Sequence, residues 1–231
     1  MKNWFQKFMA LTLLLSVFFL ARRGAAFVSA QVSDIEKEQP CIVIDAGHGA
    51  SDPGKVGLNG ALEKDINLAI ALKLKPILEN KGYKVVLTRE TDEILADKNA
   101  SNKKRDDMVG RVKVIEEANP VFTISIHQNS FSNSTVSGPQ VFYYAESKEG
   151  KELAYQLQES LDKIIKPESP RKTKANSEYY LLKRTPTPTV IVECGFLSNE
   201  REAELLVTDL YQDKLARAIY FGVKNYLKSV S

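Results

Sequence analysis

The sequence predicts an α/β fold, a single domain in which helices cover both faces of a mostly parallel sheet. Short apolar, β-branched runs alternate along the chain with segments whose apolar residues recur at helical spacing. A length of 231 residues and a hydrophobic content of 43% are enough for one domain with a buried core. Sheets of this kind bind ligands at the carboxyl ends of their strands.

The beginning of the chain has the pattern of an export signal. Lys2 and Lys7 flank the start of an apolar run at residues 8–21, which is shorter than the roughly 20 residues of a membrane-spanning helix. The small residues that end at Ala30 suit cleavage at that point. We expect residues 1–30 to be a signal peptide, or a signal anchor if cleavage does not occur.

The leader also accounts for the basic character of the chain. Of the 32 Lys and Arg residues, four lie in residues 1–30, so 28 remain against 29 Asp and Glu in the rest of the chain. This balance gives no reason to expect a nucleic-acid partner.

We expect residues 31–40 to form a polar linker and residues 41–229 the folded domain, with membrane contact only through the N-terminal segment.

The first half of the domain is predicted to contain strands and helices in alternation. Apolar runs rich in β-branched residues predict the strands, and apolar residues spaced three or four apart predict the helices. In order, these are a strand at 41–44, a helix at 64–80, a strand at 83–89, a polar stretch at 90–107, a helix with Met108, Val112 and Ile115 inward, and a strand at 121–127.

The second half continues this pattern. Its expected elements are a strand at 139–144, a helix at 148–166, a strand at 178–183, a strand at 189–194 and a last helix that ends near Leu227. Asn199 is the expected N-cap of the last helix, because Glu202 follows it three residues later.

The chain has only two histidines, and both follow apolar strand-like runs. His48 comes after the run at 41–44, and His127 ends the run at 121–127. Glu193 lies near the end of a third such run. Because parallel strands end at the same edge of a sheet, one crevice is expected to hold these side chains.

Two imidazoles and one carboxylate form the ligand set of many catalytic zinc sites. The spacing of the residues leaves the carboxylate open among Asp45, Asp52, Glu63 and Glu193. Asp52 lies in "ASDPG", where an aspartate usually caps a turn. Glu63 begins the first long helix, where a glutamate is also favoured by the helix dipole alone.

The two cysteines are expected to be free thiols. Cys41 opens its strand, whereas Cys194 lies at the far end of another. If the two strands are parallel, their opposite ends are on the order of 15 Å apart, which is beyond the reach of a disulfide.

Four stretches together resemble the successive blocks of one enzyme family. They are "IVIDAGHGASDPG", "LEKDINLAIALKLKPILENKGYKVVLTRETD", "ISIHQNS" and "IVECGFLSNEREAELL". In order and spacing, from about residue 41 to 228, they resemble the zinc-dependent N-acetylmuramoyl-L-alanine amidases of the type 3 catalytic domain. The chain length and the short leader are most similar to the germination-specific amidases that act on spore cortex.

The resemblance implies a zinc hydrolase that cleaves the amide between the lactyl group of N-acetylmuramic acid and L-alanine in peptidoglycan. It also implies an exported enzyme that acts in the cell wall or the forespore intermembrane space. By position, the family's metal ligands fall on His48, Glu63 and His127, and its catalytic carboxylate falls on Glu193. Arg111 matches a family arginine, and we expect Arg111 and Asn129 to bind substrate or to fix the strand ends.

The chain departs from the family pattern at Ile115 and Glu116 and in "HQNS", which affects only the expected fit of the substrate. The 65 residues between His127 and Glu193 leave little room for the inhibitory helix that some relatives insert. The sequence has no recognisable wall-binding repeat, so we expect a protein partner that targets or activates the enzyme. Two alternatives stay open, a wall peptidase with Cys194 as nucleophile and His127 as base, and a peptidoglycan-binding module without turnover.

Overall fold

The structure is a computed structural model that describes residues 2–35, 39–97 and 99–230. It divides into two units, Met1–Gln39 and Pro40–Ser231. In the first, helix α1 spans Lys2–Ile35 and so includes half of the predicted linker, which has no Gly or Pro before residue 36 to end a helix. Within the described residues, no helix is both long enough and apolar enough to cross a membrane.

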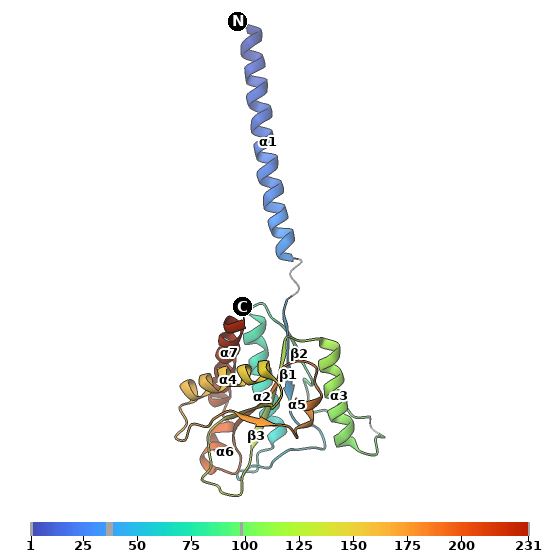
Figure 1. Cartoon of the computed structure of the whole chain (residues 1–231), viewed down its shortest axis with the longest axis vertical. Helices are drawn as coiled ribbons and strands as arrows, with labels where there is room; N and C mark the ends of the chain where they lie inside the picture. The colour runs from blue at the N-terminus through green and yellow to red at the C-terminus, as the bar shows by residue number, and fades with distance from the viewer. Residues whose placement is uncertain (1, 36–38, 98, 231) are drawn as a thin grey trace. The chain divides into compact units, whose positions relative to one another are not determined.

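The second unit is built on a six-stranded sheet in the order β2-β1-β3-β6-β4-β5. The strands are β1 Cys41–Ala46, β2 Lys84–Leu87, β3 Phe122–Asn129, β4 Gln140–Tyr144, β5 Lys174–Asn176 and β6 Thr189–Phe196. All neighbouring strands are parallel except β4 and β6, which are antiparallel. The predicted mostly parallel sheet is therefore confirmed (Figure 1).

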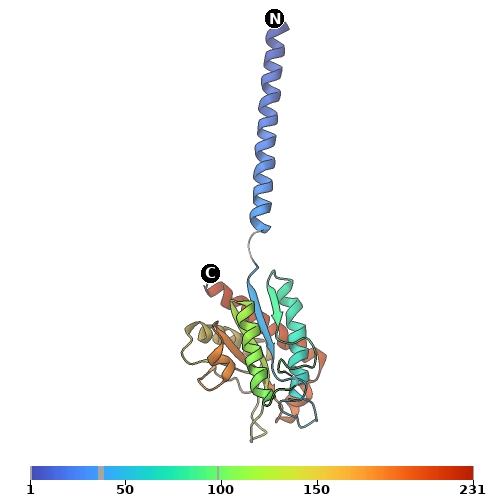
Figure 2. The ribbon, with the colours of Figure 1, turned by 90° about the vertical axis from the view of Figure 1, so that its right-hand side faces the viewer.

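Helices cover both faces of this sheet, as predicted. They are α2 Glu63–Glu79, α3 Lys103–Ala118, α4 Lys148–Ile165, α5 Tyr180–Arg184, α6 Glu200–Leu206 and α7 Asp209–Val230. Helices α2, α4 and α7 pack on one another and on one face, whereas α3 and α5 pack on the other face (Figures 1 and 2).

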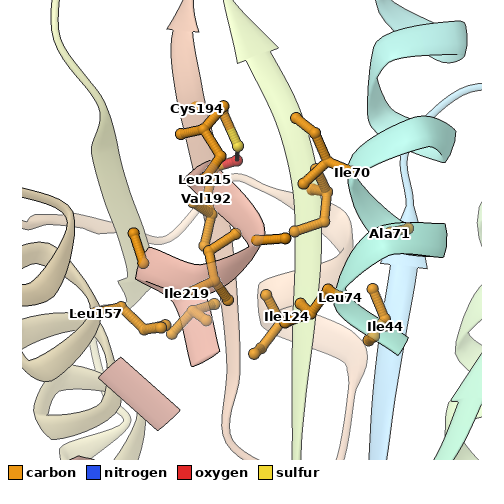
Figure 3. Packing of buried hydrophobic residues seen from close by; sticks show 14 of the residues in the cluster. Ile44, Ile70, Ala71, Leu74, Ile124, Leu157, Val192, Cys194, Leu215 and Ile219 are labelled. Carbon is orange, nitrogen blue, oxygen red and sulfur yellow. Dashed lines mark hydrogen bonds between the residues drawn. The ribbon is translucent and has the colours of Figure 1, made fainter. Parts of the chain in front are cut away.

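Alternation along the strands divides the core between the two faces. Ile42 and Ile44 of β1 face the large cluster formed with α2, α4 and α7, while Val43 between them packs with α3 and α5. Figure 3 shows side chains of α2 and α7 meeting those of β1, β3 and β6 in the large cluster. The face toward α3 and α5 carries fewer apolar side chains and several polar ones.

The same alternation places Glu193 and Cys194 on opposite faces of β6. Cys194 is fully buried in the large cluster beside α2 and α7 (Figure 3). Burial raises the pKa of its thiol, and the charge of Glu193 adds to the rise. A cysteine in this position is a packing residue rather than a nucleophile.

One predicted strand, at residues 178–183, is wrong. The structure has the short strand β5 at Lys174–Asn176 and the helix α5 in place of the predicted one. The Asn176 side chain accepts hydrogen bonds from the backbone amides of Glu178 and Tyr179, which turns the chain. Leu181 and Leu182 are then buried at successive positions, which a strand with one buried face does not permit.

The last helix is in fact two helices. Asn199 caps α6 as predicted, because its side-chain oxygen accepts a hydrogen bond from the amide of Glu202. Helix α6 ends at Leu206, where the Thr208 hydroxyl and the Gln212 amide donate to the carbonyl oxygens of Leu205 and Leu206. Side chains thus replace the helical hydrogen bonds, and α7 begins at Asp209.

We expect both cysteines to be reduced in the purified protein. Cys41 and Cys194 are free, and β3 separates their strands in the sheet. Intact mass spectrometry should show no gain of two hydrogens on treatment with a reductant. Under native conditions Cys41, which is partly exposed, should be alkylated faster than Cys194. A disulfide, or faster labelling of Cys194, would contradict this arrangement.

Candidate active site

Three predicted ligands converge at the carboxyl ends of the parallel strands. His48 lies in the loop after β1, Glu63 is the first residue of α2, and His127 lies on β3. One ligand atom from each of the three lies within 4.8 Å of the others. The structure therefore brings these three predicted residues together, and Glu63 is the carboxylate that lies between the histidines.

Strand register explains this convergence. Residue Ala46 pairs with Ile126, and the next amide, that of Gly47, donates to the Ile126 carbonyl at 3.1 Å. His127 in turn pairs directly with Glu193 on β6. The three central strands thus end side by side, and the register shifts just after His127, where β3 leaves regular pairing.

The distances in the cluster suit one small metal ion. Oε1 of Glu63 lies 2.9 Å from Nδ1 of His127 and 3.3 Å from Nε2 of His48. Ligand atoms in a tetrahedral zinc site with bonds of about 2.0–2.1 Å are about 3.3 Å apart. The residues therefore fit a zinc ion both in donor chemistry and in spacing.

Hydrogen bonds from outside the cluster fix the two flexible ligands. Asp52 lies 2.9 Å from Nδ1 of His48, which turns Nε2 toward Glu63. Asp52 also accepts a hydrogen bond from the amide of Gly54, so it caps the turn as predicted. The second Glu63 oxygen accepts a hydrogen bond from the amide of Lys55 at 2.8 Å.

Glu63 is held in the ionised form. Burial by itself would raise the pKa of its carboxyl, but hydrogen bonds and charges from His127 and His48 outweigh burial and lower the pKa far below its usual range. The amide of Gln128 adds a hydrogen bond of 3.1 Å to the same oxygen that faces the histidines. A carboxylate so stabilised is a suitable ligand for a divalent cation.

Glu193 lies beside the cluster in a different environment. Its side chain is 8% exposed, and among the described residues its buried Oε2 has no hydrogen-bond partner. Burial, assisted by the charge of Glu63 and opposed by that of His127, raises the pKa of Glu193 to about 7. A carboxyl group with a pKa near neutrality can both accept and return a proton, which is the requirement for a general base.

The two predicted substrate residues occupy different positions. Arg111 is buried on α3, and its guanidinium donates four hydrogen bonds to protein acceptors, among them Asp45 and Asp107. Asn129 lies at the end of β3 and accepts a hydrogen bond from the next amide, that of Ser130. Substrate binding by either residue stays a prediction.

A cavity of about 350 Å³ opens above the cluster. Besides the residues already named, its walls include Lys104 at the start of α3 and Tyr179 and Tyr180 at the start of α5. The Tyr179 ring packs against Phe142, with the ring centroids 5.6 Å apart. The sequence did not indicate that Tyr179 and Tyr180 line the cavity, because both lie in the stretch that was predicted to be a strand. No local sequence signal places α5 beside β6.

An α/β fold with two histidines and a carboxylate at the strand ends, beside a buried second carboxylate, is typical of metal-dependent hydrolases. Comparison with known proteins gives the family within that class. Residues 42–225 match the family model of N-acetylmuramoyl-L-alanine amidases, so the chain belongs to this family and is an amidase.

Several relatives are similar over most of their length. The germination-specific N-acetylmuramoyl-L-alanine amidase of Bacillus subtilis strain 168 is 38% identical over 188 residues, which cover 80% of this chain and 78% of that protein. The CwlD amidase of Clostridioides difficile, solved in complex with the GerS lipoprotein, is 40% identical, with a TM-score of 0.80 over 83% of this chain and 100% of that chain. The amidase AmiC2 of Nostoc punctiforme is 33% identical, with a TM-score of 0.73 over 83% and 98% of the two chains.

We expect Gly47→Ala to disrupt the cluster without unfolding the protein. A Cβ atom at Gly47 would lie 2.2 Å from Cε1 and 2.3 Å from Nε2 of His127, so the imidazole must move. A displacement on the order of 1 Å should reduce activity by about a hundredfold. Zinc binding, measured by competition with a chromophoric chelator, should weaken as well.

Gly222→Ala is the matched control for this substitution. Its Cβ would lie 2.7 Å from Cα of Leu157, in the packing between α4 and α7 and on the other face of the sheet. Both variants should unfold at a lower temperature, because overpacking costs about 1–3 kcal/mol. Only Gly47→Ala should lose zinc affinity. Equal zinc affinities in the two variants would show that the contact of Gly47 with His127 does not shape the cluster.

Proposed function

We propose that the protein is a zinc-dependent peptidoglycan hydrolase that cleaves the amide bond between the lactyl group of N-acetylmuramic acid and L-alanine. The observation that carries this proposal is the grouping of His48, Glu63 and His127 beside the buried Glu193, in a chain that belongs to the amidase family. In this proposal the three grouped residues are the metal ligands, and Glu193 is the catalytic residue.

Zinc held by these residues would lower the pKa of a water molecule and polarise the amide carbonyl. The protein contributes the acid–base chemistry. Glu193 accepts a proton from the attacking water, because it lines the same cavity as the three grouped residues and its pKa is near neutrality. It then delivers the proton to the nitrogen of the departing L-alanine, so the carboxylate is regenerated in each cycle.

The cavity provides a site for the groups on either side of the scissile amide. Tyr179 and Tyr180 add aromatic side chains to the cavity wall, and Lys104 adds a cationic one. Peptidoglycan presents matching groups, because a sugar can pack on aromatic rings and the stem peptide carries carboxylates. The cavity walls therefore suit a muramoyl peptide on both sides of the bond to be cleaved.

We infer that the enzyme is exported and acts on spore cortex. This inference is supported by the relative of B. subtilis, which is named a germination-specific amidase, and by the signal-like residues 1–30. The similar C. difficile amidase was solved with a lipoprotein, and we propose that a protein partner of this kind also assists this chain. Residues 41–229 then form the catalytic domain, which agrees with the compact unit Pro40–Ser231.

We expect Glu193→Gln to retain zinc and lose turnover. Glutamine keeps the size of the side chain but cannot accept the proton, so the rate should fall by about two to four powers of ten. Zinc content should be unchanged, because Glu193 is not one of the three proposed ligands. The rate is measured as stem peptide released from peptidoglycan, and the metal by elemental analysis.

Cys194→Ala is the control for this variant, because it changes the next residue on the opposite face of β6. This variant should keep near-normal activity. The reverse result, an active Glu193→Gln variant and an inactive Cys194→Ala variant, would replace the zinc mechanism by a cysteine one.

We expect purified residues 31–231, supplied with zinc, to release free stem peptides that begin with L-alanine from peptidoglycan. The products are identified by mass spectrometry, with cortex and vegetative wall digested in parallel. A chelator should abolish release, and cortex should be the better substrate. Release that resists the chelator would refute the zinc mechanism.

The same assay tests the remaining parts of the proposal. Equal release from both walls would remove the cortex assignment. Release only after addition of a spore extract would show that a partner is required. Binding of the protein to peptidoglycan without release under any of these conditions would favour a binding module.

A further inference from the structure

Two buried arginines bind the backbone that leads into the first histidine. Arg89, just after β2, donates to the carbonyl oxygens of Ala46 and Gly47 at 2.8 and 3.1 Å. Arg111, on α3, donates to the carbonyl oxygens of Ala46 and His48 at 2.8 and 2.7 Å. Three consecutive carbonyl groups therefore have an arginine as partner.

These carbonyl groups lie where β1 leaves the sheet. After Ala46 the regular pairing of β1 ends, so the next backbone groups need other partners. The backbone then takes a costly path, because His48 has a φ of 63°, in the left-handed region that residues other than glycine rarely adopt. Without external partners, an extended backbone at this position would be favoured.

Both arginines are themselves fixed from several sides. Arg111 forms ion pairs with Asp45 at 2.6 Å and Asp107 at 2.8 Å, and it is 2% exposed. Arg89 is 3% exposed and also donates to the carbonyl oxygen of Lys64, at 2.7 Å. Because Lys64 follows Glu63 at the start of α2, Arg89 connects the segment before one proposed ligand to the segment after another.

The charges of these arginines argue against a role in attracting a cation. Burial, together with the nearby charge of Arg111, lowers the pKa of Arg89, so the charge of Arg89 is less stable here than in water. The useful property of arginine here is the geometry of its planar guanidinium. It holds several N–H donors in fixed directions and can donate to several carbonyl oxygens at once. Lysine carries the same charge without this geometry.

We propose that Arg89 and Arg111 are positioning residues that hold residues 46–48 in the conformation required for His48 to bind the metal. We call this pair the arginine clamp. The inference rests on the proposed function, because it concerns the same metal site. It also assigns Arg111 a role other than the substrate contact predicted from the sequence, since four of its five N–H donors are used by the protein.

The test measures zinc affinity in the full chain for Arg89→Lys and Arg111→Lys. Each substitution keeps the charge and removes the fork of donors. The zinc dissociation constant, obtained by competition with a chromophoric chelator, should rise about 10- to 100-fold in each variant, as for other residues that orient metal ligands. Far-UV circular dichroism of the metal-free variants should match that of the wild type at the temperature of the measurement.

The control is Gln158→Met, which removes buried hydrogen bonds to Val141 and Pro139 between α4 and β4. It should lower the unfolding temperature and leave the zinc dissociation constant within about twofold of the wild type. If the lysine variants behave like this control, the arginines serve only stability and the proposal is overturned. A raised KM with unchanged zinc affinity would assign Arg111 to substrate binding, which also overturns it.

Asp107→Asn gives a milder test if the lysine variants do not fold. It weakens one of the two ion pairs that orient Arg111 and keeps the size of the side chain. The zinc dissociation constant should again rise, and an unchanged value would contradict the clamp. Failure of the wild-type chain itself to bind zinc would refute the proposed function, so the two failures are distinguishable.

Discussion

The buried ion pair between Asp45 and Arg111 is the interaction on which the arrangement of the site depends. Both side chains are 2% exposed, and Asp45 also accepts hydrogen bonds from Thr88 and Ser125. Burial by itself would raise the pKa of Asp45, but Arg111 and these hydroxyl groups lower it to about 2. One carboxylate thus joins β1, the end of β2, β3 and α3. Removal of Arg111 would leave the buried charge of Asp45 without its ion pair, at a cost of about 3–5 kcal/mol.

The close approach of backbone to side chain is a second constraint on the site. Gly47 passes directly against the His127 imidazole, and Gly54 lies against Glu63 and His48, where an added Cβ would be 2.5 Å from a Glu63 oxygen. Both glycines therefore allow the loops to close around the cluster. Polar residues fix the directions of the His48 and Glu63 side chains, and glycines provide the space in which these side chains and His127 meet.

The sequence predicted the sheet, most helices and the grouping of His48, Glu63 and His127, because each of these depends on local periodicity or on the rule that parallel strands end together. It did not predict α5, since its tyrosines and leucines fit either element and the deciding turn at Asn176 depends on a side-chain hydrogen bond. It also did not predict that Arg111 contacts Asp45 and His48, which lie more than 60 residues away in the chain. Contacts over such separations have no local signature.

Strand register links the chemistry of the site to the packing of the core. In β3 and β6, residues that alternate with the core residues Ile126 and Cys194 point to the opposite face, and these residues include His127 and Glu193. A shift of β6 by one residue would place the carboxylate among α2 and α7 and a thiol beside the histidines. The fully buried apolar side chains of β6 oppose such a shift, so the hydrophobic core holds Glu193, the proposed general base, on the side of the histidines.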